Sequence, residues 1–103
     1  MSIFLGTWNI NGNGFLGQLN FFDDPSGQVQ TGNIYDQPLE NVVESGNVIS
    51  FTRNLDNLSP GYRQAYTGTV YDSSFGRVLI GLFIERGGTG PQGATYGWSA
   101  VLQ

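Results

Sequence analysis

The side chains that could carry out acid–base or nucleophilic chemistry are few in this sequence. It contains no His and no Cys, and its four basic residues are all Arg, so it contains no Lys either. These absences exclude Ser-His and Cys-His pairs, ordinary zinc sites, disulfides, P-loops and lysine Schiff bases. Any catalysis would have to depend on carboxylates.

The eight acidic residues do not form a recognisable catalytic pair. Asp23 and Asp24 are adjacent, so they would point to opposite faces of a strand, and the Pro-Ser-Gly that follows at 25–27 indicates a turn. Glu40 and Glu44 share a face in either a strand or a helix, but nothing in the nearby sequence indicates a cleft. The D-x-D-x-D-G spacing of a calcium loop is absent. We therefore expect a protein that is not an enzyme and that has no metal or cofactor.

Residues 12–17, GNGFLG, match the glycine pattern of a dinucleotide-binding loop. In that loop a helix begins directly after the glycines, and its N-terminal amides bind the pyrophosphate. Here the sequence LGQLNFF follows, and it alternates as a strand does. The glycines are therefore interpreted as turn and bend positions of a β-hairpin.

The charge and hydropathy of the chain exclude several kinds of partner. The net charge is −4 and the Arg residues are scattered, which makes a poor surface for nucleic acid. The longest apolar run, Val78–Ile84, is far shorter than the roughly 20 residues that a membrane helix needs. The first residues, MSIFLGTWNI, lack the basic start and cleavage pattern of a signal peptide. We therefore expect no nucleic acid or membrane partner, and a cytoplasmic location.

The elements that must position any site are strands. Extended runs rich in aromatic and β-branched residues alternate with turn residues at a spacing of about 8–12 residues. Asn, Asp and Gly in the connections allow the positive φ of tight hairpins. Residues 36–46 could instead form a short helix, with Pro38 at its first position and Gly46 after its end. The strands are predicted near Ile3–Ile10, Phe15–Phe22, Gln28–Tyr35, Leu39–Glu44, Val48–Arg53, Arg63–Tyr71, Arg77–Glu85 and Thr95–Leu102.

The connections between these strands indicate how they are arranged. Turns this short force antiparallel neighbours, because a parallel crossover needs a dozen or more residues. One domain, residues 1–103, would then form an all-β up-and-down barrel of about eight strands or a two-sheet sandwich. The regular series of short turns favours the barrel, which also removes the sheet edges. A barrel of this size is either filled by side chains or holds one small ligand.

The C-terminal hairpin is apolar on both faces. In Arg77–Glu85 and in Thr95–Leu102, the two sets of alternating side chains are both largely apolar or small. A sheet with one face in water would instead alternate with polar residues. We therefore expect a homo-oligomer, a dimer or tetramer, built through this hairpin.

The order of several motifs resembles the avidin and streptavidin family. Gly6-Thr7-Trp8-Asn9 resembles the opening strand of that family, GQVQTGNIY at 27–35 resembles its Gly-x-x-Thr-Gly-x-Tyr strand, and Tyr66-Thr67-Gly68 lies where it has Trp-x-Gly. The chain has only Trp8 and Trp98, where the family has several Trp around biotin. The resemblance therefore implies a small calycin-like barrel rather than biotin binding.

Four residues are candidates for ligand binding: Trp8, Asn9, Tyr35 and Tyr66. The resemblance places the first three at the mouth of a barrel, where Trp8 and Tyr35 would form an apolar wall and Asn9 would orient the ligand. The abundance of amides and Tyr suits a neutral ligand that forms hydrogen bonds. We therefore expect a non-catalytic binding module for a small neutral ligand. The alternatives are a carbohydrate-binding protein, or a structural or oligomerisation domain with a filled barrel.

Overall fold

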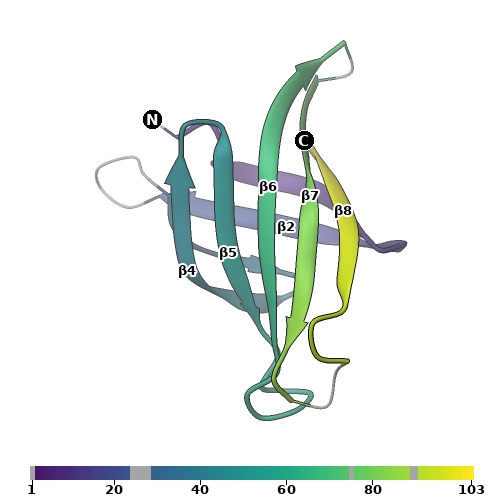
Figure 1. Cartoon of the computed structure of the whole chain (residues 1–103). Helices are drawn as coiled ribbons and strands as arrows, with labels where there is room; N and C mark the ends of the chain where they lie inside the picture. The colour runs from purple at the N-terminus through teal and green to yellow at the C-terminus, as the bar shows by residue number, and fades with distance from the viewer. Residues whose placement is uncertain (1, 24–28, 75, 89–90) are drawn as a thin grey trace.

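The computed structural model describes residues 2–23, 29–74, 76–88 and 91–103, which form a closed barrel of antiparallel strands (Figure 1). Each strand pairs with its neighbours along the chain, and the first strand pairs with the last. The predicted up-and-down barrel is therefore confirmed. The strands are β1 Gly6–Gly12, β2 Phe15–Asp23, β3 Val29–Ile34, β4 Gln37–Ser45, β5 Val48–Asn54, β6 Arg63–Ser73, β7 Gly76–Arg86 and β8 Thr95–Leu102.

The alternative helix over residues 36–46 is wrong, because this segment is mostly strand β4. Tyr35 and Asp36 form the turn between β3 and β4, which pairs Ile34 with Gln37. The predicted turn at 25–27 lies outside the described residues. The described part of the chain contains no helix that could cross a membrane.

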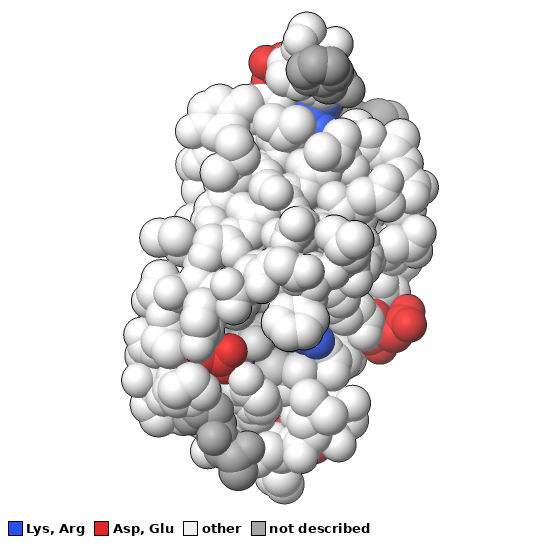
Figure 2. Space-filling model, turned by 90° about the vertical axis from the view of Figure 1, so that its right-hand side faces the viewer, with Lys and Arg blue, Asp and Glu red and all other residues white. Residues whose placement is uncertain are grey.

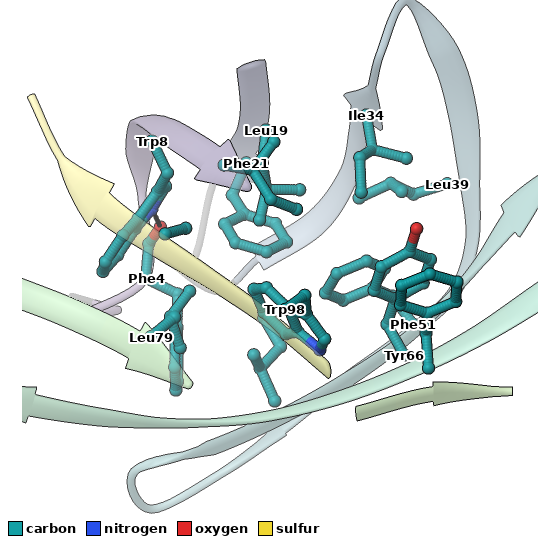
Figure 3. Packing of buried hydrophobic residues seen from close by; sticks show 14 of the residues in the cluster. Phe4, Trp8, Leu19, Phe21, Ile34, Leu39, Phe51, Tyr66, Leu79 and Trp98 are labelled. Carbon is teal, nitrogen blue, oxygen red and sulfur yellow. Dashed lines mark hydrogen bonds between the residues drawn. The ribbon is translucent and has the colours of Figure 1, made fainter. Parts of the chain in front are cut away.

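One end of the barrel is closed by the residues that precede β1. The sequence predicts a strand from Ile3, but residues 3 and 4 form a turn, and β1 begins only at Gly6. The turn places Phe4 in the end of the barrel, where its side chain is fully buried near Trp8 and Leu79 (Figure 3). Trp8 donates a hydrogen bond of 2.9 Å from Nε1 to the carbonyl oxygen of Phe4. We call this the closed end.

Both ends of the chain lie at the closed end (Figure 1). The pairing of β1 with β8 sets Trp8 opposite Leu102. The backbone N–H of Gln103 donates a hydrogen bond of 3.0 Å to the carbonyl oxygen of Thr7. The side chain of Gln103 donates a second bond, of 2.9 Å, to Oδ1 of Asn9. The last residue of the chain is thereby fixed beside the first strand.

The inward side chains of β5–β8 form rows across the sheet, because directly paired residues lie side by side. One row, the aromatic row, is Phe51, Tyr66, Phe83 and Tyr96. The next row, farther from the closed end, is the polar row of Arg53, Gln64 and Glu85. The interior of the barrel therefore changes from apolar to polar along its axis.

Trp98 lies one row closer to the closed end than the aromatic row. It is paired with Gly81, which is paired in turn with Gly68. A Cβ atom on Gly68 would lie 2.5 Å from the indole ring, so glycine is needed there for the ring to lie across the sheet. Nε1 of Trp98 donates to the carbonyl oxygens of Thr67 and Leu82, both at 3.2 Å.

The outer surface of β6–β8 differs from that of β1–β3. On β1–β3, Thr7, Asn20 and Asn33 form a polar row joined by side-chain hydrogen bonds of 2.7 Å. On β7, by contrast, Ile80 and Leu82 point outward and are more than half exposed. Figure 2 shows the side of the barrel that carries β8, with few charged atoms across its centre. We call the outward residues Tyr71, Val78, Ile80, Leu82 and Val101 the apolar face.

Candidate functional site: a pocket at the open end of the barrel

The end of the barrel opposite Phe4 is open and contains a pocket of about 490 Å³. The filled interior thus reaches only part of the way along the barrel. The pocket is lined by residues from the β1–β2 and β3–β4 turns and from the ends of β5–β8 that meet there. These are Gly12, Asn13, Phe15, Leu16, Tyr35, Arg53, Tyr62, Gln64, Tyr66, Phe83, Glu85 and Tyr96.

The floor of the pocket is formed by Tyr66, Phe83 and Tyr96 of the aromatic row. The ring of Tyr66 stacks on Phe51 at 5.1 Å and on Phe83 at 4.7 Å, measured between ring centroids. Tyr96 lies beyond Phe83 at 5.3 Å with its ring tilted by 40°. Trp98 packs edge-on against Tyr66 at 5.7 Å from below. The rings hold one another in place and give the pocket an apolar base.

The polar row forms one wall of the pocket, and a single amide connects it. Gln64 Oε1 accepts hydrogen bonds of 2.9 Å from Arg53 Nη1 and from the Tyr66 hydroxyl. Gln64 Nε2 donates a bond of 2.9 Å to Glu85 Oε1. Arg53 also donates from Nε to Gln37 Oε1. The orientation of the Gln64 amide is therefore fixed from both sides.

Glu85 is the residue of this wall whose side chain lacks a hydrogen-bond partner for one of its polar atoms. Its side chain points inward and the residue is only 5% exposed. One carboxylate oxygen, Oε2, is buried without a hydrogen-bond partner. Among the described residues no Arg forms an ion pair with it. Leaving a buried polar atom unpaired costs about 1–3 kcal/mol, and more for a charged group, so this oxygen requires an explanation.

Tyr35 forms a further part of the pocket wall, and its backbone has an unusual conformation. Its φ is 50°, and that of Asp36 is 64°, as in the type I′ turns where Asn and Gly are preferred. A bulky residue in this region is strained. Its hydroxyl accepts a bond of 3.1 Å from the Gly12 N–H and donates to the Phe15 carbonyl oxygen. A Cβ atom on Gly17 would lie 2.3 Å from the ring.

The Tyr35 ring also meets the polar row. The guanidinium carbon of Arg53 lies 4.6 Å from the centroid of the ring, which is the geometry of a cation–π contact. The strained turn, the two glycines and this contact all hold the ring in one position. Tyr35 therefore connects the β1–β2 hairpin to the wall formed by β5–β7.

The phenols of Tyr35, Tyr62 and Tyr66 are neutral near pH 7, because the pKa of each is raised. Burial raises the pKa of Tyr66 and of Tyr35 above the ordinary value of 10.0. Burial, and next the neighbouring Glu85 carboxylate, raise the pKa of Tyr62. These hydroxyls can therefore donate and accept hydrogen bonds but do not act as phenolate bases.

The structure brings together two of the four predicted site residues. Tyr35 and Tyr66 both line the pocket. Trp8 does not, because β1 runs from the closed end to the open end and Trp8 lies near its start, fully buried among apolar side chains. Asn9 is exposed on the outside of β1 and is bonded to Gln103. The expected wall of Trp8 and Tyr35 with an amide from Asn9 is therefore not the arrangement found.

Three residues of the site, those of the polar row, were missed at the sequence level. The signal was available in the alternation of the strands, since Glu85 has the same parity as the inward Leu79 and Phe83. Arg53 likewise follows Phe51 by two residues. Charged residues at strand ends usually point to water, so this parity alone does not predict an inward position.

The described residues contain no group of three or more His, Cys, Asp or Glu that could hold a metal ion. Comparison of the chain with protein-family models, with curated proteins and with solved structures finds no match. The resemblance to the avidin family thus stays a prediction, although the barrel that it implies is found. The function has to be argued from the pocket itself.

Proposed function

We propose that this protein is a non-catalytic binding module that takes one small neutral ligand in the open end of the barrel. The observation that carries the proposal is the pocket itself, in which an aromatic floor meets a wall with an unpartnered buried carboxylate oxygen. Apolar pockets with a few convergent polar groups are the usual binding sites for small molecules. A structural domain with a filled barrel would need no such opening.

The charges of the pocket favour a neutral ligand. Arg53 and Glu85 have opposite charges and are connected through Gln64, so they cancel over the wall as a whole. An ionic ligand would attract one of these two charged side chains and would be repelled by the other, which has the same sign of charge as the ligand. A neutral molecule that both donates and accepts hydrogen bonds satisfies both ends without bringing in a charge that must be desolvated.

Tryptophan fluorescence tests the proposal, because the two Trp residues lie at different depths. Trp98 contacts the floor of the pocket through Tyr66, whereas Trp8 lies at the closed end. A panel of biotin, monosaccharides and disaccharides should include a compound that shifts the emission of the wild type and of the Trp8→Phe variant. The shift should be absent in Trp98→Phe. If no compound changes the emission or any backbone amide of the pocket by NMR, the binding function is rejected.

A second copy of the chain is the partner that best fits the apolar face. The chain carries a net charge of −4, so two copies repel each other unless their contact avoids the acidic residues. Ile80 and Leu82 are more than half exposed on β7, which pairs with β8. The side of the barrel that carries β8 shows few charged atoms across its centre (Figure 2). We therefore infer a homo-oligomer built through this face, as the two-sided hairpin suggests.

Light scattering tests the oligomer directly. Leu82→Glu places a charge on a side chain that is 56% exposed, so it should dissociate the assembly without unfolding the barrel. Gln18→Glu, at an exposed position of β2, makes the same change of charge elsewhere and should leave the mass unchanged. A wild type with the mass of one chain at micromolar concentration would contradict the inference.

A further inference from the structure

We propose that the ligand is a saccharide, either a free monosaccharide or the terminal sugar of a glycan, with one hydroxyl that donates a hydrogen bond to Oε2 of Glu85. This inference rests on the proposed binding function and names its ligand class. It assigns Glu85 as the acceptor that selects the ligand, Arg53 as a donor to it, and the aromatic row as the surface on which the sugar ring lies.

The first argument is the unpartnered oxygen of Glu85. Oε1 is already bonded to Gln64, and the Gln64 amide cannot turn to serve Oε2, because Arg53 and Tyr66 both donate to its oxygen. Within the polar row no donor reaches Oε2, so its donor is either the hydroxyl of Tyr62, the phenol that lies beside Glu85, or a hydroxyl of the ligand. A hydroxyl that donates to a carboxylate forms a charge-assisted bond, which is roughly twice as strong as a neutral one.

The second argument separates a hydroxyl from an ammonium group. Arg53 stands two places from Glu85 in the same row, so a cation bound at Glu85 would be repelled by the guanidinium. Among the described residues, the hydrogen bonds of Arg53 to Gln37 and Gln64 use Nε and Nη1, and these two bonds leave Nη2 as a further donor. A sugar has hydroxyls on adjacent carbons, each able to donate and to accept. One such pair matches an acceptor and a donor in the same wall.

The third argument is the shape of the pocket. Its volume of about 490 Å³ is enough for one sugar residue with room to spare, and it opens at the end of the barrel, where a glycan chain can leave. Tyr66, Phe83 and Tyr96 line the base. The C–H faces of a pyranose pack well on aromatic rings, while its hydroxyls need the polar groups at its edge.

Access to Glu85 passes Tyr62. Oε2 is shielded from bulk water, and the phenol of Tyr62 lies near enough to Glu85 for the carboxylate to raise its pKa. Tyr62 itself is only half-buried and lines the pocket. We therefore place the entry of the donating hydroxyl beside this ring, with a small rotation of the Tyr62 side chain.

The test is an NMR titration of the ¹⁵N-labelled full chain with the methyl glycosides of glucose, galactose and mannose. Benzylammonium, benzoate and dioxane serve as a cation, an anion and a neutral acceptor without a donor. At least one glycoside should shift amides of the pocket, such as those of Gly12 and Glu85, and the other three compounds should not. An oligosaccharide ending in the same sugar distinguishes the two sources: tighter binding indicates a glycan terminus, and equal binding a free sugar.

Glu85→Gln tests the assigned contact, because it keeps the shape of the side chain and removes the charge. We expect the glycoside to bind about 10- to 100-fold more weakly, as for the loss of a hydrogen bond to a charged group. Asp72→Asn, on the exposed end of β6, makes the same change of charge and should bind as the wild type does. Unchanged affinity in Glu85→Gln would overturn the assignment.

The outcomes for the ligand class and for the binding function are separate. If one of the compounds without hydroxyls shifts the pocket amides and no glycoside does, the saccharide class is wrong while the binding module stands. If no compound shifts any amide resonance of the pocket at the highest concentration tested, both the saccharide proposal and the binding function fail. Circular dichroism of each variant confirms that the barrel is retained.

Discussion

The two ends of the barrel are built from the same strands and the same alternation of side chains, but they differ in what those side chains are. At the closed end, Phe4, Trp8 and Leu79 are fully buried, and the indole N–H is bonded to a carbonyl oxygen. At the open end, the inward positions are Arg53 and Glu85, and one buried oxygen is left without a partner.

The difference between the two ends indicates which part of the barrel contributes most to the free energy of folding. Burial of large apolar side chains is the main favourable contribution to folding, and the closed end and the middle of the barrel supply most of it. The open end can therefore hold the buried Glu85 carboxylate and a strained Tyr35 backbone at a cost that the rest of the barrel offsets. Such costly features gather at functional sites.

The largest expected effect comes from breaking the closed end. Trp8→Ala removes a fully buried ring and its hydrogen bond, and should lower the free energy of unfolding by about 3–5 kcal/mol. Phe15→Ala, at a pocket residue that is 71% exposed, should change it by no more than about 0.5 kcal/mol. Urea unfolding measures both. Equal losses would mean that the two ends contribute alike.

A smaller effect is expected where glycine makes room for a pocket wall. Gly17→Ala sets a methyl group 2.3 Å from the Tyr35 ring, and the forced shift should cost about 1–3 kcal/mol. It should also move the amide resonances of Gly12, which is bonded to the Tyr35 hydroxyl. Gly97→Ala, with nothing within 4 Å of its Cβ, is the matched control and should leave both stability and spectrum nearly unchanged.

Glu85→Gln should act in the opposite direction and stabilise the ligand-free protein. It replaces a buried, partly unsatisfied charge by a neutral amide, for which burial costs less. A gain of about 1 kcal/mol would raise Tm by about 4–8 °C for a domain of this size. Thermal unfolding at pH 7 measures it, with Asp72→Asn as the control. A clear loss of stability would show that Oε2 has a partner within the protein.

The smallest effect concerns the loop that leads to Tyr62. The Arg63 side chain, and next the N–H of Gly61, lower the pKa of Asp56 from 3.8 to about 2. Because the folded pKa is the lower one, the contact stabilises the fold at pH values above 3.8, and the effect is lost as the pH falls towards 2. Asp56→Asn should therefore shift the urea midpoint slightly at pH 7, and the shift should vanish near pH 2. A shift that does not depend on pH would exclude the charge as its source.

The strands could be predicted from the sequence because their signal is local. Alternation in Arg77–Glu85 and the turn residues between strands are visible in short windows, and the predicted strands match β1–β8 in order. The turn at Phe4 was missed, because apolar residues in a turn look like the start of a strand. Only its burial in the end of the barrel explains it.

The site was harder to predict, because it depends on which strand ends meet. Tyr66 was predicted as a site residue and lines the pocket. Trp8 was predicted at the mouth, but its position along β1 puts it at the other end of the barrel. Arg53 and Glu85 are far apart in sequence, and only the register of β5–β7 brings them into one row. That register follows from the lengths of the strands and turns together.

The position of both chain ends beside the closed end has a practical consequence for attaching this molecule to anything else. A tag, a linker or a solid support joined at either end leaves the molecule at the closed end, where Phe4 and Gln103 lie, whereas the pocket with Tyr35 and Glu85 lies at the open end. Chips and beads loaded through a terminal tag will therefore present the pocket outward. The fold of the barrel thus sets the orientation of the immobilised protein. A ligand screen on a surface therefore needs no change to the positions of the chain ends.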